Sequence, residues 1–279
     1  LYSRPGESAI RVTSQSQMKL NASSIDIVRS LMQPEEFIAS TIARMVGATR
    51  TRIVTDSTES DYARYVTLDT IVSEPLPVLM NWTLLESDNM YTELFLRQLG
   101  YYASSMGSNK NNKNHFHGGF NRLSGKIPVD VEQLGLKQVR STLVDKLGVS
   151  GDAFKQVDGS GLSRHNLLSP QGLIETIVKL HEADRSLFRL YLSLLPVGGV
   201  SGTLKNRFLD YPGVVRAKTG SMTGVISLAG LVDSKFGASQ GRGPYVFAFI
   251  VNQSAATSAD IRKAIDTVVI ALHLMDPSC

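Results

Sequence analysis

The sequence predicts an α+β domain in which a short antiparallel sheet is packed against helices. Three runs rich in β-branched and aromatic residues, at 214–219, 225–232 and 245–252, are separated by glycine-rich turns. This spacing is typical of an antiparallel meander. A helical pattern follows the last run, and Ser258 or Asp260 can cap it. The apolar stripe of this closing helix would lie on the sheet and contains Ile261, Ile265, Val268, Val269 and Leu272.

Helical patterns also precede the sheet. Pro34 suits the first turn of a helix, and Gly47 suits its end. Residues 8–29 alternate instead with the period of extended strands, so we expect a domain boundary near residue 30. A second helix is predicted to begin after Asn89 and to end at Gly100.

The middle of the chain mixes helices with irregular segments. Two further helical patterns cover residues 134–147 and 172–181. The stretch 103–128 is rich in serine, asparagine and lysine, so it is predicted to be a long polar surface loop. Pro196 and the glycines that follow it predict a turn-rich segment before the sheet.

The composition excludes several classes of protein. The 279 residues suffice to bury a core, and the net charge of +4 comes from dispersed lysines and arginines, so no nucleic-acid partner is expected. No apolar stretch of the sequence approaches the ~18 residues of a membrane span. The one cysteine, Cys279, can form no disulfide within the chain. His115 and His117 lie in the polar stretch without an obvious third ligand, so we expect no metal and no other cofactor.

The triplet Lys218-Thr219-Gly220 ends one of the predicted strands. At a strand edge, Lys218 can approach a site from behind while Thr219 and the backbone face a substrate carboxylate. Gly220 has no side chain to block this approach, and the N–H of Ser221 can stabilise an oxyanion. A plain strand end followed by a glycine turn is the alternative reading of the triplet alone.

A second triplet, Ser87-Asp88-Asn89, directly precedes an amphipathic pattern. Serine and aspartate at this position most often cap a helix. The functional alternative is that Ser87 relays a proton while Asn89 orients a substrate amide.

Two longer segments accompany these triplets in a fixed order. One runs from Val157 to Asn166 and is followed by Ser169-Pro170; the other runs from Leu195 to Lys205. With both triplets, they make the chain resemble the class C low-molecular-mass penicillin-binding proteins, which are D-alanyl-D-alanine carboxypeptidases and endopeptidases, from about residue 31 to 272.

The resemblance implies a fold of the penicillin-binding transpeptidase and serine β-lactamase type. It also implies that a serine attacks the D-Ala-D-Ala bond of peptidoglycan stem peptides, that an acyl-enzyme forms and that water hydrolyses it. β-Lactams would acylate the same serine. By position, Ser87, Asn89 and Lys218 match the family's catalytic residues, whereas Thr219, Gly220 and Ser221 match the substrate and oxyanion site. The loop from Asp158 to Ser163 is expected to support the wall of a cleft between the two triplets.

The nucleophile of this family stands in a Ser-x-x-Lys element, and only Ser16 and Lys19 fit that spacing. The element requires a helix, but residues around Ser16 alternate with period two, so the two side chains would diverge. We therefore expect residues 1–29 to be the end of an inserted accessory β domain and 30–279 to be the C-terminal part of the catalytic domain. The true nucleophile would lie before Leu1, which makes the fold incomplete at its N-terminus.

A catalytically dead relative that binds cell-wall peptide or a partner protein is the alternative to the enzyme. A β-lactamase would share both triplets but should lack the 157–166 segment. Since a cell-wall peptidase acts outside the cytoplasmic membrane, the substrate implies a periplasmic or extracytoplasmic location. The sequence leaves the oligomeric state open.

Overall fold

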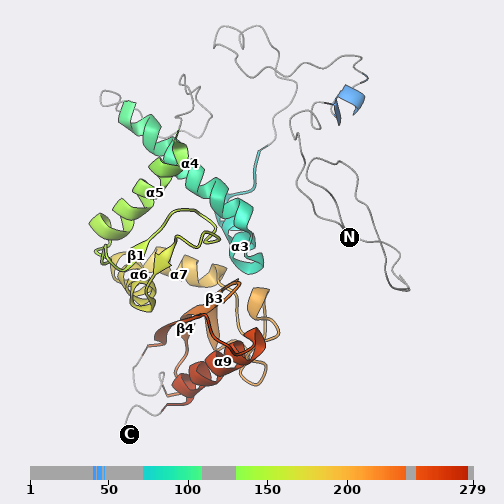
Figure 1. Cartoon of the computed structure of the whole chain (residues 1–279), viewed down its shortest axis with the longest axis vertical. Coiled ribbons are helices and arrows are strands. Elements are labelled where there is room, and N and C mark those ends of the chain that lie inside the picture. The colour runs from blue at the N-terminus through green and yellow to red at the C-terminus, as the bar shows by residue number, and fades with distance from the viewer. Residues whose placement is uncertain are drawn as a thin grey trace. The chain divides into compact units, whose positions relative to one another are not determined.

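The computed structural model describes residues 40–41, 43–45, 47, 72–108, 130–236 and 243–275. The chain divides into two compact units, Leu1–Thr70 and Ile71–Cys279. Nearly all of the described residues belong to the second unit, whose labelled helices and strands are drawn in Figure 1.

In the first unit, the described residues agree with the helix predicted to end at Gly47. Residues 40–41 and 43–45 are helical, and Gly47 follows in a turn with a φ of 69°. Glycine is the usual residue at such a left-handed helix end. Residues 1–29 lie outside the described residues, so the predicted accessory domain stays a prediction.

The sheet is the antiparallel meander that the sequence predicts. Strands β3 (Val215–Met222), β4 (Val225–Val232) and β5 (Tyr245–Asn252) pair in the order β3-β4-β5 (Figure 1). Residues that pair across neighbouring strands share one face of a sheet. Ala217 pairs with Gly230, which pairs with Phe247, so all three lie on the same face.

Helix α9 (Ser258–Leu274) packs against that face. Ile265 and Val269 of the helix are buried there as predicted, whereas Val268 is 47% exposed and does not lie on the sheet. The cap is Thr257, whose hydroxyl accepts the N–H of Asp260 at 3.2 Å. The predicted caps Ser258 and Asp260 were wrong because the helix begins with Ser258, so the extended residue before it takes the capping position.

The core between the sheet and α9 consists of buried apolar side chains from both layers and from the turn-rich segment before β3. Its members are Leu204, Phe208, Val215, Ala217, Ile226, Leu228, Val232, Phe247, Ile265 and Val269.

Helices α6 (Pro170–Ala183) and α7 (Arg185–Leu194) contribute to a second core on the other face of the sheet. Ile177 of α6, Phe188 of α7 and Leu231 of β4 are buried together there. Helix α6 confirms the pattern predicted for 172–181, with Ser169 as its cap.

Further from the sheet lie α3 (Leu76–Glu86), α4 (Asn89–Ser108) and α5 (Val131–Ser141), and α5 continues into a π-helical turn (Thr142–Lys146) (Figure 1). A two-stranded ladder of β1 (Phe154–Lys155) and β2 (Leu167–Leu168) flanks the loop between them, and a short 3₁₀ turn, η2, spans Gly202–Leu204.

Helix α4 is longer than predicted, because Gly100 does not end it. The helix continues to Ser108, and therefore includes the first residues of the stretch predicted as a loop at 103–128. A Cβ on Gly100 would lie 1.7 Å from the carbonyl oxygen of Val131. Gly100 is thus a contact point between α4 and α5 rather than a helix stop. Residues 109–129 lie outside the described residues.

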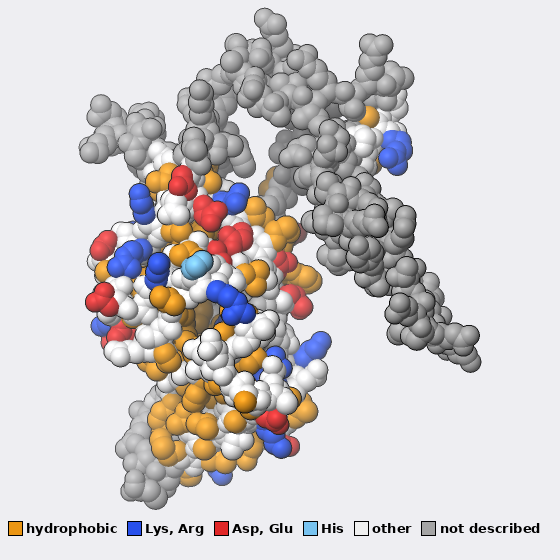
Figure 2. All heavy atoms as spheres, in the orientation of Figure 1, with side chains coloured by type: hydrophobic (Ala, Val, Ile, Leu, Met, Phe, Trp, Pro, Cys, Tyr) orange, Lys and Arg blue, Asp and Glu red, His pale blue; other side chains and the backbone are white. Residues whose placement is uncertain are grey.

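The surface agrees with the dispersed charge of the sequence. Figure 2 shows Lys and Arg side chains interspersed with Asp and Glu on the face in view, without one large patch of a single sign. In the part of the chain that the structure describes, none of the helices is both long and apolar enough to cross a membrane.

Candidate active site

Within the triplet Ser87-Asp88-Asn89, Ser87 and Asp88 have different structural roles. Ser87 ends α3 in the left-handed conformation, with φ 60° and ψ 48°. Asp88 then caps α4: its Oδ1 accepts the N–H groups of Met90 at 2.9 Å and Tyr91 at 3.1 Å. The capping reading is therefore right for Asp88. The hydroxyl of Ser87 is left to contact a different part of the chain.

That contact is with Lys218 of β3. The ammonium Nζ of Lys218 donates to the hydroxyl of Ser87 at 2.7 Å and to the carbonyl of Thr219 at 3.0 Å. Burial lowers the pKa of Lys218 below its ordinary 10.5, because a desolvated ammonium is less stable than a solvated one. The structure thus joins the two triplets through a lysine whose proton is easier to remove than that of a surface lysine.

Thr219 lies on the opposite face of β3 from Lys218, as strand alternation requires. Its hydroxyl donates to the hydroxyl of Thr203, in η2, at 2.9 Å. Thr203 was not predicted as a site residue, because it is separated from Thr219 by 16 residues and belongs to a turn. The pair places two hydroxyl groups side by side at the edge strand β3.

In β3, every second residue directs its backbone N–H and C=O groups to the outer edge of the strand, away from β4. Ala217 donates its N–H to the carbonyl of Pro196 at 3.1 Å, so Ala217 is one of the residues that point outward. Thr219 and Ser221 have the same parity and point their backbone groups to the same edge. The N–H of Ser221 therefore points to the outer edge of β3, the edge at which the oxyanion donor is predicted.

The structure explains why position 220 is a glycine. A Cβ at this position would lie 2.4 Å from the hydroxyl oxygen of Ser227, the residue that faces Gly220 in β4. The absent side chain therefore makes room for Ser227 inside the sheet.

Asn89 is the first residue of α4 and is exposed. Among the described residues, no hydrogen bond joins its side-chain amide to Ser87 or Lys218. The structure thus brings Ser87, Lys218 and Thr219 into one connected group and places Asn89 next to that group in sequence. Ser16 and Lys19 lie outside the described residues.

Two of the three described histidines make structural contacts, and the third, His165, is exposed. His181 packs edge-on against Phe188, with ring centroids 4.9 Å apart, and the Nδ1 of the buried His273 hydrogen-bonds the carbonyl of Asp233. Over the described ranges, no three His, Cys, Asp or Glu side chains gather as a metal site would require. His115 and His117 lie outside these ranges.

Comparison with known proteins places the family match and the similar relatives in the same group of carboxypeptidases. Residues 120–272 match the D-Ala-D-Ala carboxypeptidase 3 (S13) family. The penicillin-sensitive carboxypeptidase A of Dictyostelium discoideum is 37% identical over 204 residues, which are 72% of this chain and 35% of that protein. The D-alanyl-D-alanine carboxypeptidase DacB of Haemophilus influenzae is 31% identical over 170 residues, or 60% of this chain and 30% of that one.

A solved structure extends the likeness to the fold. Penicillin binding protein 4 (dacB) from Haemophilus influenzae aligns with a TM-score of 0.55 at 25% identity, over 73% of this chain and 41% of that chain. This likeness confirms the predicted class, an α+β penicillin-binding fold with an antiparallel sheet packed against helices. The chain spans less than half the length of each of these relatives.

Proposed function

Because the chain belongs to the D-Ala-D-Ala carboxypeptidase 3 (S13) family, we propose that it is part of a serine-type carboxypeptidase or endopeptidase. The substrate would be the D-Ala-D-Ala bond of peptidoglycan stem peptides, and penicillins would inhibit the enzyme. In this proposal, residues 30–279 form the C-terminal part of the catalytic domain.

The observation that carries the proposal is the 2.7 Å contact between Lys218 Nζ and Ser87 Oγ. A lysine with a lowered pKa can hold and pass a proton through the serine hydroxyl to a leaving amine.

In the proposed reaction, these residues act together with a serine nucleophile. A serine hydroxyl from a Ser-x-x-Lys element upstream of this sequence attacks the carbonyl of the scissile bond and loses its proton to a nearby base. The N–H of Ser221 stabilises the oxyanion, and Ser87, backed by Lys218, protonates the departing D-Ala nitrogen as the C–N bond breaks. Water then hydrolyses the ester. Thr219 binds the terminal carboxylate, and the amide of Asn89 orients the peptide.

The substrate also suggests the place of action. Peptidoglycan lies outside the cytoplasmic membrane, so we propose a periplasmic or extracytoplasmic location. The partners would be stem peptides and β-lactams.

Release of D-alanine from an N-acylated peptide ending in D-Ala-D-Ala tests the proposal in the full-length protein. We expect hydrolysis by the unaltered protein and a fall in kcat/KM of about 100-fold for Ser87→Ala, the usual effect of losing a proton-transfer group. Ser193→Ala is the matched control, because that exposed hydroxyl only caps a carbonyl within α7. Binding of the peptide without any hydrolysis would instead favour the catalytically dead relative.

A further inference from the structure

The loop between β1 and β2 is held internally by one aspartate. Asp158 Oδ1 accepts the N–H of Gly161 and the side-chain amide of Asn166, both at 2.8 Å, while Oδ2 accepts the N–H of Ser163 at 2.6 Å. Asn166 in turn accepts the N–H of Val157 at 2.8 Å. These bonds make residues 157–166 a single preformed unit, because each end of the loop is tied to its centre.

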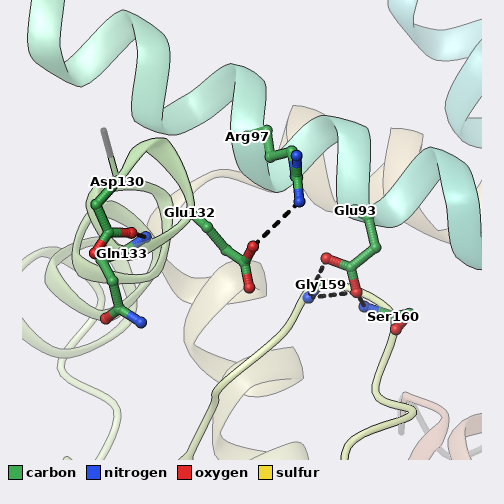
Figure 3. A network of polar contacts seen from close by, with 7 residues as sticks. All are labelled: Glu93, Arg97, Asp130, Glu132, Gln133, Gly159 and Ser160. Carbon is green, nitrogen blue, oxygen red and sulfur yellow. Dashed lines mark hydrogen bonds and ion pairs between the residues drawn. The ribbon is translucent and has the colours of Figure 1, made fainter. Parts of the chain in front are cut away.

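Glu93 fastens this unit to α4. Its Oε1 accepts the N–H groups of Gly159 at 3.1 Å and Ser160 at 2.9 Å, and its Oε2 lies 3.2 Å from the Gly159 nitrogen. Figure 3 shows the carboxylate pointing from the helix onto the loop backbone. Hydrogen bonds from backbone amides to a carboxylate are about twice as strong as hydrogen bonds between neutral groups.

The packing beneath this contact is equally specific. A Cβ on Gly159 would lie 2.5 Å from the carbonyl oxygen of Thr92, so the loop backbone rests directly on the helix backbone. Glu93 lies four residues after Asn89, and residues at this spacing share one face of a helix. The loop is therefore anchored one turn from the residue that the proposed function assigns to the substrate amide.

The same loop also contacts the turn between β3 and β4. Arg164 donates from Nη2 to the carbonyl oxygen of Thr223 at 2.9 Å. Thr223 lies in the turn between β3 and β4, two residues after Ser221. One preformed loop thus connects the N-terminal part of α4 with the end of the strand that carries the proposed oxyanion donor.

We propose that Glu93 is a positioning residue: its carboxylate holds the 157–166 loop on α4, and the loop, through Arg164, fixes Asn89 relative to Ser221. This inference rests on the proposed function for its catalytic consequence, but the anchoring itself does not. Misplacing a substrate-orienting group by about 1 Å can slow a reaction by about 100-fold. Loss of the anchor should therefore slow the reaction without unfolding the protein.

The test uses Glu93→Ala and Glu93→Gln in the full-length protein. The neighbouring Glu132 supplies the control, Glu132→Ala, because its carboxylate lies 3.4 Å from Arg97 at the surface and does not contact the loop (Figure 3). Hydrogen exchange of the 157–166 amides is the first measurement. We expect exchange to rise at least about 10-fold in Glu93→Ala, less in Glu93→Gln, which keeps one acceptor oxygen, and not at all in the control.

The rate of acylation by a penicillin is the second measurement. We expect a fall of at least about 10-fold in Glu93→Ala, with exchange in the β3–β5 sheet unchanged. Unchanged exchange in the loop would overturn the anchoring role, and faster exchange with unaltered acylation would overturn the positioning role. If the unaltered protein is not acylated at all, the proposed function fails, while the exchange measurement still decides whether Glu93 anchors the loop.

Discussion

Gly100→Ala should destabilise the protein, although the same change in an ordinary helix is stabilising. Alanine is preferred over glycine inside helices by about 1 kcal/mol. Here the new Cβ would lie 1.7 Å from the carbonyl oxygen of Val131 and 2.7 Å from the nitrogen of Gly135. Both atoms belong to backbone, so neither can rotate away. Helices α4 and α5 must separate by more than 1 Å to reach ordinary contact distances.

The change in unfolding free energy caused by Gly100→Ala is the difference between a cost of overpacking and a gain in helix preference. Overpacking typically costs about 1–3 kcal/mol and more where backbone must move, which exceeds the helix preference of about 1 kcal/mol. We expect a net loss of about 2 kcal/mol, or a fall in Tm of about 4–8 °C for a unit of this size. Urea unfolding of the full-length protein measures the difference. Gln98→Ala, at an exposed position of the same helix, should stay within about 0.5 kcal/mol. A neutral or stabilising Gly100→Ala would refute the close helix contact.

Two further predictions concern charged side chains. Asp266→Ala should lower the free energy of unfolding by about 2–4 kcal/mol, because it removes the partner of Arg207, which donates to Asp266 through both Nε and Nη2. The side chains of Arg207 and Asp266 are only 15% and 22% exposed. A loss below about 0.5 kcal/mol in urea unfolding would contradict this prediction. For Lys218, the folded-state pKa lies below its ordinary 10.5, so the folded state loses its proton first as pH rises. The stability of the unaltered protein relative to Lys218→Met should therefore increase with pH between the folded pKa and 10.5, and a decrease over that window would show that the pKa is raised instead.

The sheet could be predicted from the sequence because its signal is local. Each strand is a short run rich in β-branched or aromatic residues, glycine-containing turns separate the three runs, and the β4 and β5 boundaries match the predicted ones. Helix α3 was missed because apolar residues occur all around Leu76–Glu86, which leaves no stripe to reveal a helical period. The error at Gly100 has a different cause: glycine permits both a helix end and a close helix contact, and only the position of α5 decides between them.

The candidate site depends on contacts that no local pattern contains. Ser87 and Lys218 are 131 residues apart, so their pairing could be expected only from the ordered motifs of a known family. Glu93 and Gly159 are 66 residues apart, and a lone glutamate on a helix gives no sign that its partners are backbone amides of a distant loop. The hydroxyl pair of Thr203 and Thr219 was hidden for the same reason.

If Lys218 and Ser87 belong to the active site of a penicillin-sensitive peptidase, as we propose, the rate of acylation by a fluorescent penicillin should depend on Lys218. The measurement compares the unaltered full-length protein with Lys218→Ala and with Lys263→Ala, an exposed lysine on α9. We expect rapid labelling of the unaltered protein and of Lys263→Ala, and labelling at least about 100-fold slower for Lys218→Ala. Equal labelling of all three proteins, or none of any, would contradict the proposal.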